Sequence, residues 1–161
     1  MEKEGGKDMR YKTHLVTSFA VVAPVAIMTN NVDIMGACGL ALGAILPDID
    51  EPGSYVGRRI PLIPYILKRV FGHRGMTHTL LATMLFVLLA IIIPNSFTCM
   101  LAIGYFLHIL EDTFSVSGIK WFAPFNSKVL AFKWYSTGKS SESIIFIYMC
   151  AVICLESFLW L

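Results

Sequence analysis

The chain has 161 residues, of which 56% are hydrophobic and 15% charged, with a mean hydropathy of +0.67 and a net charge of +2. Soluble domains are about one quarter charged, and a domain of this size cannot hide so much apolar surface from water. The composition therefore excludes an ordinary soluble fold and favours one compact membrane domain over residues 1–161. The net charge is too small to indicate a nucleic-acid partner.

Five apolar segments are predicted to be transmembrane helices, after a charged leader (residues 1–12) that we expect to be retained in the cytoplasm. They cover roughly residues 14–29, 34–47, 79–94, 97–110 and 144–161. Several are shorter than the ~20 residues that a straight span prefers, which indicates a thinned bilayer or a bundle that opens into a polar cavity at one end. The predicted fold is an all-α integral membrane bundle of about five helices.

The first four segments form two similar helical hairpins. A Thr-His pair opens each hairpin, at residues 13–14 and 77–78, and an aspartate follows each histidine by 34 residues, at Asp48 and Asp112. Each threonine is expected to cap its helix N-terminus. The spacing Gly39-x-x-x-Gly43 in the second segment predicts that another helix approaches closely there.

The distribution of positive charge predicts the topology. Four of the thirteen Lys and Arg residues precede the first segment, five lie between the second and third, and four lie between the fourth and fifth. The turns near residues 30–33 and 95 and the C-terminus carry none. Under the positive-inside rule, the protein is a multi-pass cell-membrane protein with a cytoplasmic N-terminus and an outside C-terminus.

On this topology, all four histidines and most isolated acids fall at the cytoplasmic ends of the helices. Polar residues mark helix ends in any membrane protein, so a single one carries little weight. Four histidines together with several acids are costly at a membrane unless they are paired or bind a metal. The candidate ligands are His14, Asp48, Asp50, His73, His78, His108 and Asp112.

Three local patterns support a metal site. His108 and Asp112 share one helix face, although a simple ion pair would explain that spacing equally well. Residues 47–52 hold three acids between two prolines, which is costly without a cation unless the loop is simply solvated. Residues 72–78 place two histidines around Arg74 before a helix N-terminus, where Arg74 could contact phosphate or anionic headgroups.

Two further segments look interfacial. Residues 64–71 mix apolar and basic side chains, and residues 118–135 are rich in aromatic side chains. Such segments favour the headgroup level of a membrane, either as simple anchors or as a lipid-facing lip around the site.

Taken together, these motifs resemble the membrane-bound metal-dependent hydrolases, a family of bacterial and archaeal inner-membrane proteins, over nearly the whole chain. The resemblance rests on residues 13–14, 46–50 and 72–78, on His108-x-x-x-Asp112, on Gly118 with Pro124-Phe125, and on a closing motif at residues 137–142 that includes Glu142. That family is distantly similar to zinc-dependent phospholipase C and related zinc nucleases. The resemblance implies a metal cluster and phosphoesterase chemistry. Fold analogy alone does not establish a reaction, so this chemistry is an expectation.

The sequence thus predicts a metal-dependent hydrolase with two or three divalent ions. Zinc suits mixed His and carboxylate ligands, and manganese is the alternative. The metals would supply hydroxide near neutral pH, Arg74 would stabilise developing charge, and Glu111 would act as a base or as an orienting partner. The expected substrate is a phospholipid or another amphiphilic phosphoester. The rival predictions are a metal transporter or sensor and a non-catalytic membrane scaffold with structural metal.

Overall fold

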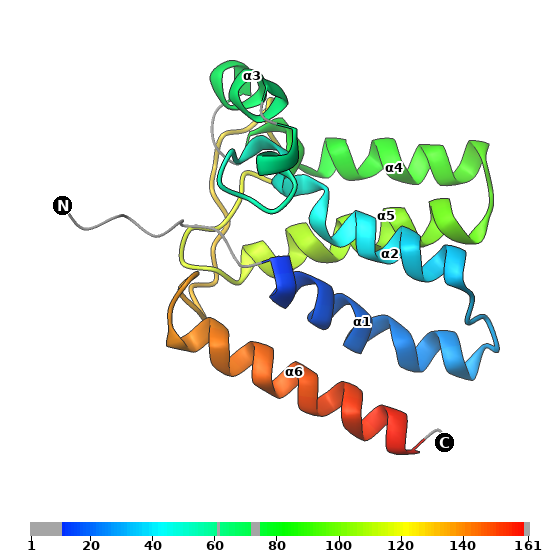
Figure 1. The fold of residues 1–161 in the computed structure, drawn as a ribbon. Coiled ribbons are helices and arrows are strands. Elements are labelled where there is room, and N and C mark those ends of the chain that lie inside the picture. The colour runs from blue at the N-terminus through cyan, green and yellow to red at the C-terminus, as the bar shows by residue number, and fades with distance from the viewer. Residues whose placement is uncertain (1–10, 61, 72–74, 160–161) are drawn as a thin grey trace.

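A computed structural model describes residues 11–60, 62–71 and 75–159 of the chain, and this part contains six α-helices and no β-strand (Figure 1). The all-α prediction is therefore confirmed, and each of the five apolar segments contains a helix. These helices are α1 (Tyr11–Met28), α2 (Ile34–Ile45), α4 (Leu80–Ile92), α5 (Ser96–Thr113) and α6 (Ser140–Leu159). The sixth, α3 (Leu62–Phe71), contains the segment predicted to be interfacial. Short 3-10 turns are η1 (Pro47–Asp50), η2 (Gly57–Arg59) and η3 (Met76–His78).

The helix caps differ from those expected. α1 already begins at Tyr11, so Thr13 lies inside the helix, and the cap of α4 is Thr79 rather than Thr77. The predicted capping roles of Thr13 and Thr77 are therefore wrong, and both hydroxyls donate instead to carboxylates described below. Asn95 caps α5 through a reciprocal pair of hydrogen bonds with the third helical residue.

α2 and α5 form the centre of the bundle, although they belong to different predicted hairpins. A Cβ atom built on Gly43 would lie 2.2 Å from the backbone oxygen of Leu101, and one on Gly39 would lie 2.2 Å from that of Phe97. Gly104 on α5 faces the backbone of Leu40 in the same way, at 2.4 Å. The predicted close approach at the glycines of α2 is confirmed, because the two backbones are in contact there.

Only α1 and α6, among the described residues, are long and apolar enough by length and composition to count as candidate membrane spans. α2 and α4 are apolar but have 12 and 13 residues. α4 and α6 expose large apolar side chains along their length, including Leu85, Ile91, Ile147 and Phe158. Five complete spans therefore remain a prediction.

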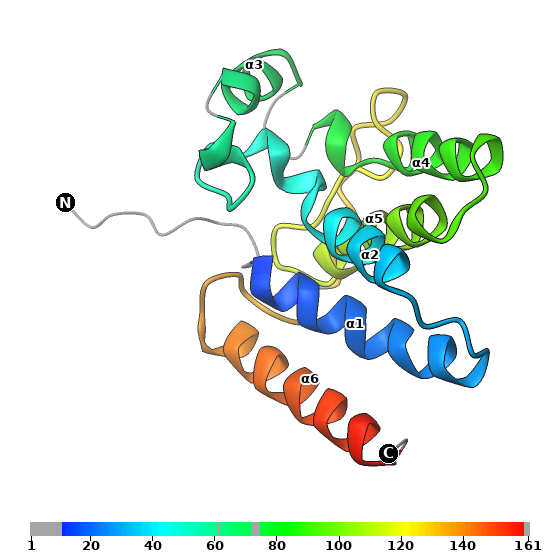
Figure 2. The same ribbon diagram turned by 45° about the vertical axis from the view of Figure 1, so that its right-hand side comes forward.

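The connecting segments divide between two ends of the bundle (Figures 1 and 2). One end carries η1, η2, α3, η3 and residues 114–139, together with the first residues of α1, α4 and α6. The other end carries the short turns after α1 and α4 and the last turn of α6. All nine described Lys and Arg residues belong to segments at the first end, as the charge pattern predicts. We call it the basic end.

Candidate metal centre

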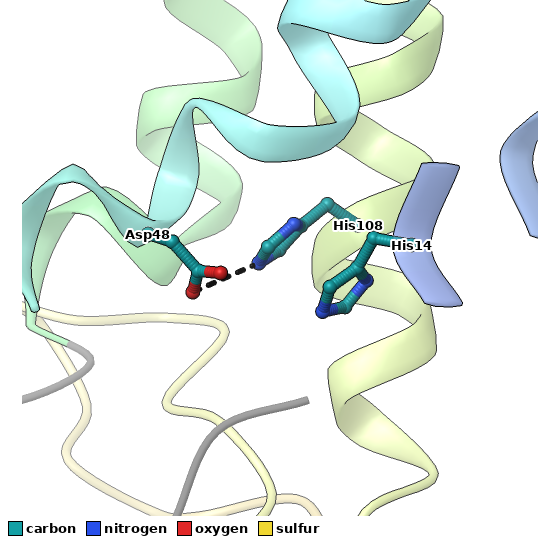
Figure 3. Close-up of side chains that lie close together, drawn as sticks. All are labelled: His14, Asp48 and His108. Carbon is teal, nitrogen blue, oxygen red and sulfur yellow. Dashed lines mark ion pairs between the residues drawn. The ribbon is translucent and has the colours of Figure 1, made fainter. Parts of the chain in front are cut away.

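Three histidines from three helical segments meet inside the basic end. His14 lies in the first turn of α1, His78 ends η3, and His108 lies near the end of α5. All three are at most 1% exposed. The rings of His14 and His108 stack with their centroids 3.8 Å apart, and Figure 3 shows both beside Asp48. The helix starts and ends that the sequence places at one membrane face thus converge in space.

A partner at the Nδ1 atom holds each imidazole. Nδ1 of His14 shares a hydrogen bond of 2.6 Å with Glu111, and Nδ1 of His108 lies 2.7 Å from the backbone oxygen of Ala44. Nδ1 of His78 lies 3.0 Å from the hydroxyl of Thr77. A carbonyl oxygen only accepts, so Nδ1 of His108 donates to Ala44, and Nε2 is the ring nitrogen available to a metal. Partners of this kind fix the tautomer and orientation of metal-ligating histidines.

The opposite nitrogen, Nε2, of each ring faces Asp112, and those of His78 and His108 also face Asp48. Nε2 of His78 lies 3.5 Å from Oδ2 of Asp112 and 3.7 Å from Oδ1 of Asp48. Nε2 of His108 lies 3.6 Å from Oδ1 of Asp48 and 3.9 Å from Oδ2 of Asp112. Nε2 of His14 lies 3.8 Å from Oδ1 of Asp112. These separations are too long for hydrogen bonds, while donors around a tetrahedral zinc ion lie about 3.3 Å apart.

These five residues fit a metal ion. Within the described part of the chain, the buried Nε2 atoms of His78 and His108 have no hydrogen-bond partner, which is costly unless something else binds them. The donor atoms form two triads, and within each triad the three atoms lie within 4.8 Å of one another. One triad is His14, Asp48 and His108, and the other is His78, His108 and Asp112. Because both triads use His108, the donors form one continuous cluster. The cluster could hold a metal ion, and we call it the metal centre.

Asp50 occupies a different position from the other predicted ligands. Its Oδ2 accepts a 2.7 Å hydrogen bond from Thr77 and lies 3.6 Å from Nδ1 of His78, on the side of the ring away from the inner donors. It belongs to neither triad. Asp50 therefore lies on the Nδ1 side of His78, as Glu111 lies on the Nδ1 side of His14.

The electrostatics of the metal centre follow from this crowding of opposite charges. Burial raises the pKa of Asp48, but the nearby His108 and His78 outweigh it and hold that pKa well below its usual value. The pKa of Asp50 is lowered in the same way, mainly by His78 against burial. Burial lowers the pKa of His78, but the carboxylates of Asp48 and Asp50 outweigh it and raise this pKa to about 10. In the absence of metal, protonated His78 thus neutralises part of the carboxylate charge.

The remaining predicted residues lie outside the metal centre or outside the described residues. His73 and Arg74 belong to the second group. Glu142 is buried at the start of α6, where it accepts hydrogen bonds from the hydroxyl of Thr13 at 3.0 Å and from the backbone of Gly138. Glu142 therefore connects α6 to the turn of α1 that carries His14.

Sequence reasoning missed two groups that hold the histidines. The backbone oxygen of Ala44 carries no side-chain signal at all. Thr77 was expected to cap a helix, but its hydroxyl bridges Asp50 and His78, and its backbone oxygen accepts a 2.5 Å hydrogen bond from Tyr105. The adjacency of Thr77 to His78 was the one available indication of this role.

Comparison with known proteins relates the chain to an inner-membrane family. The sequence profile of the family described as YdjM inner membrane protein matches residues 9–160. "Uncharacterized protein YvsG" of Bacillus subtilis is 32% identical over 139 residues, which is 85% of this chain and 87% of that protein. "Inner membrane protein YdjM" of Escherichia coli and that of Shigella flexneri are each 40% identical over 87 residues, covering 48% of this chain and 43% of those proteins. No solved structure matches the chain.

Proposed function

Since the chain belongs to the YdjM inner membrane protein family, we propose that it is a membrane-embedded metal-dependent hydrolase whose active site is the metal centre. The observation that carries this proposal is the set of three buried histidines that gather around Asp48 and Asp112. Structural zinc sites are closed and take four ligands, whereas this cluster offers five inner donors before His73 is counted. Such a cluster suits two ions with an open position.

The proposed topology has α1, α2, α4, α5 and α6 all crossing the cell membrane, with the N-terminus in the cytoplasm and the C-terminus outside. It is supported by the gathering of the described Lys and Arg residues at the basic end. With 12 residues, α2 extends about 18 Å, against a hydrocarbon layer of ~30 Å. Asp48, which follows α2, would therefore reach headgroup depth where the bilayer is thinned around the protein, and would not extend into the cytoplasm.

The proposed chemistry is hydrolysis of a phosphoester. Bound zinc, or manganese as the alternative, would lower the pKa of a water molecule and stabilise negative charge on the substrate. Glu111 keeps His14 oriented through its 2.6 Å hydrogen bond, and Asp50 does the same for His78 through Thr77. Arg74, expected from the sequence to precede the α4 region, would bind the phosphate bidentately.

A phospholipid or another amphiphilic phosphoester is the proposed substrate, because a site at headgroup depth meets such molecules by lateral diffusion. The test is to load the purified protein with zinc or manganese and to measure release of phosphate or headgroup from a panel of lipid phosphoesters. Wild type is expected to hydrolyse at least one of them, and Asp48→Ala none. The proposal fails if the metal-loaded protein leaves every ester intact, or if Asp48→Ala matches wild type.

The same preparations separate the rival functions. A transporter would carry the metal into proteoliposomes, and a scaffold would bind the metal without flux or turnover. The described outer half of the bundle offers few acids, namely Asp33 and Glu156, for a transport path. We therefore expect no metal flux.

A further inference from the structure

α3 is an amphipathic helix that turns its apolar side away from the protein. It packs on the bundle through buried Pro64 and half-buried Leu67, next to η1 of the metal centre. Leu62, Tyr65, Ile66 and Val70 are 71%, 63%, 52% and 64% exposed. In a water-soluble protein an amphipathic helix buries its apolar stripe, so this arrangement requires an apolar environment outside the protein.

The direction of α3 is that of a helix lying in a membrane surface. In Figure 1 it is seen almost end-on, whereas α4 and α5 run across the view, so α3 lies across the bundle direction. The polar side of α3 is fixed by a 2.8 Å ion pair between Lys68 and Glu51. The rotation of α3 about its own axis is therefore set by contacts, and its apolar face is held outward.

A second apolar surface lies at the same end, on residues 114–139, which we call the aromatic loop. Phe125 and Trp134 are 88% and 75% exposed, and Phe122 and Phe132 are also exposed. Contacts with the end of α5 fix the loop, because the indole of Trp121 donates to Thr113 at 2.8 Å and the hydroxyl of Tyr135 donates to the backbone of Glu111 at 3.1 Å. Its aromatic side chains are thus presented on an anchored segment beside the metal centre.

We propose that α3 and the aromatic loop together form a seat for the headgroup layer of the membrane around the metal centre. Charge supports a lipid headgroup layer as the partner, since α3 and the aromatic loop together contain six Lys and Arg residues and no Asp or Glu. Basic side chains beside exposed aromatics and aliphatics match the boundary between lipid phosphates and acyl chains. The seat sets the depth of the metal centre in the bilayer, and it goes beyond the proposed reaction because it requires neither metal nor turnover.

Nitroxide labels read by electron paramagnetic resonance test the seat in the full chain, reconstituted into phospholipid vesicles. The four cysteines (Cys38, Cys99, Cys150, Cys154) are first replaced by alanine, and labels are attached to Ile66→Cys, Phe125→Cys and, as a control on the polar side of α3, Lys68→Cys. Labels in lipid collide more often with oxygen than with a water-soluble nickel chelate, and labels in water show the reverse.

The labels at positions 66 and 125 are expected to favour oxygen, and the label at 68 to favour the nickel chelate. The proposal is overturned if the label at either 66 or 125 behaves as the control does. Metal content and helix content are measured on the same samples, so that a misfolded variant is recognised and replaced by Val70→Cys or Phe122→Cys. If the labels at 66 and 125 lie in lipid but the metal-loaded wild-type protein hydrolyses no ester, the proposed reaction fails and the seat stands.

Discussion

At the scale of single residues, the metal centre separates inner donors from the groups that hold them. The inner donors could be found from sequence, because His14, His78 and His108 and their aspartates fall at helix ends of one predicted face. For the outer partners, the sequence predicts an orienting role for Glu111 but not which ring each partner holds, and the backbone oxygen of Ala44 gives no signal. Whether Glu111 reaches Nδ1 of His14, or Ala44 reaches His108, depends on how α1 and α2 are rotated against α5, and helix spacing alone does not give that rotation.

Asp112→Asn tests the inner set, because it keeps the size of the side chain but removes the charge that faces all three histidines. We expect the purified variant to lose most of its bound metal, measured by elemental analysis, with helix content unchanged by circular dichroism. Asp33→Asn is the matched control at the opposite end of the bundle, where Asp33 accepts hydrogen bonds from Ser96 and from the backbone of Gly36. Equal metal content in Asp112→Asn and wild type would refute the assignment.

Glu111→Gln distinguishes an orienting role from a catalytic one. If Glu111 acts through His14, metal affinity should fall about 10–100-fold while saturating metal restores turnover. Affinity is measured by competition with a metal-binding dye. Normal affinity combined with lost turnover at saturation would instead make Glu111 the base.

Metal uptake should release protons. With a pKa of about 10, His78 holds a proton at pH 7 in the metal-free protein, and a histidine must lose that proton to bind metal. Asp48 and Asp50, with lowered pKa values, are already ionised and release none at neutral pH. Affinity should therefore rise about tenfold per pH unit below pH 10 from His78 alone, falling as the medium is acidified. Calorimetry in two buffers of different ionisation enthalpy measures the protons released, and a value of zero would contradict the assigned charge of His78.

At the scale of helices, the sequence indicates where each element lies more clearly than which elements touch. The five apolar segments and the interfacial segment that became α3 are visible in composition. The glycines of α2 predict a close neighbour but not its identity, because the spacing of small residues is a property of one helix surface. Only the fold shows that the neighbour is α5, where Gly104 leaves room for the backbone of α2.

Gly43→Ala and Gly104→Ala should destabilise the bundle, since each added Cβ would meet backbone that has no rotamer by which to move away. We expect a loss of about 1–3 kcal/mol for each, seen as a lower Tm in detergent. Gly53→Ala is the control, because the nearest atom to its added Cβ is the end of the Glu51 side chain at 3.6 Å. A Tm for Gly43→Ala equal to that of the control would mean that α2 and α5 do not pack as described.

At the scale of the whole molecule, the basic end and the metal centre coincide. Charge counts along the chain predict this, because topology depends on composition and not on side-chain packing. The number of complete spans could not be predicted as firmly, because α2 and α4 are too short to be recognised by length.

Fusions to alkaline phosphatase and green fluorescent protein test the topology. Fused after Leu161, the phosphatase should be active and the fluorescent protein dark, because the C-terminus is expected outside. Fusions after Lys139, which precede α6, should give the reverse pattern. The same readout from both positions would show that α6 does not cross the membrane.

The division of the inner donors between the two predicted hairpins also bears on how the protein is made. His14 and Asp48 leave the ribosome with the first hairpin, but the other three inner donors arrive only with α4 and α5. The half-made chain can offer an ion two ligands at most from the inner set. On the proposed function, metal loading would therefore have to wait until α4 and α5 are in place beside α1 and α2, which would make it a late step in the making of the protein.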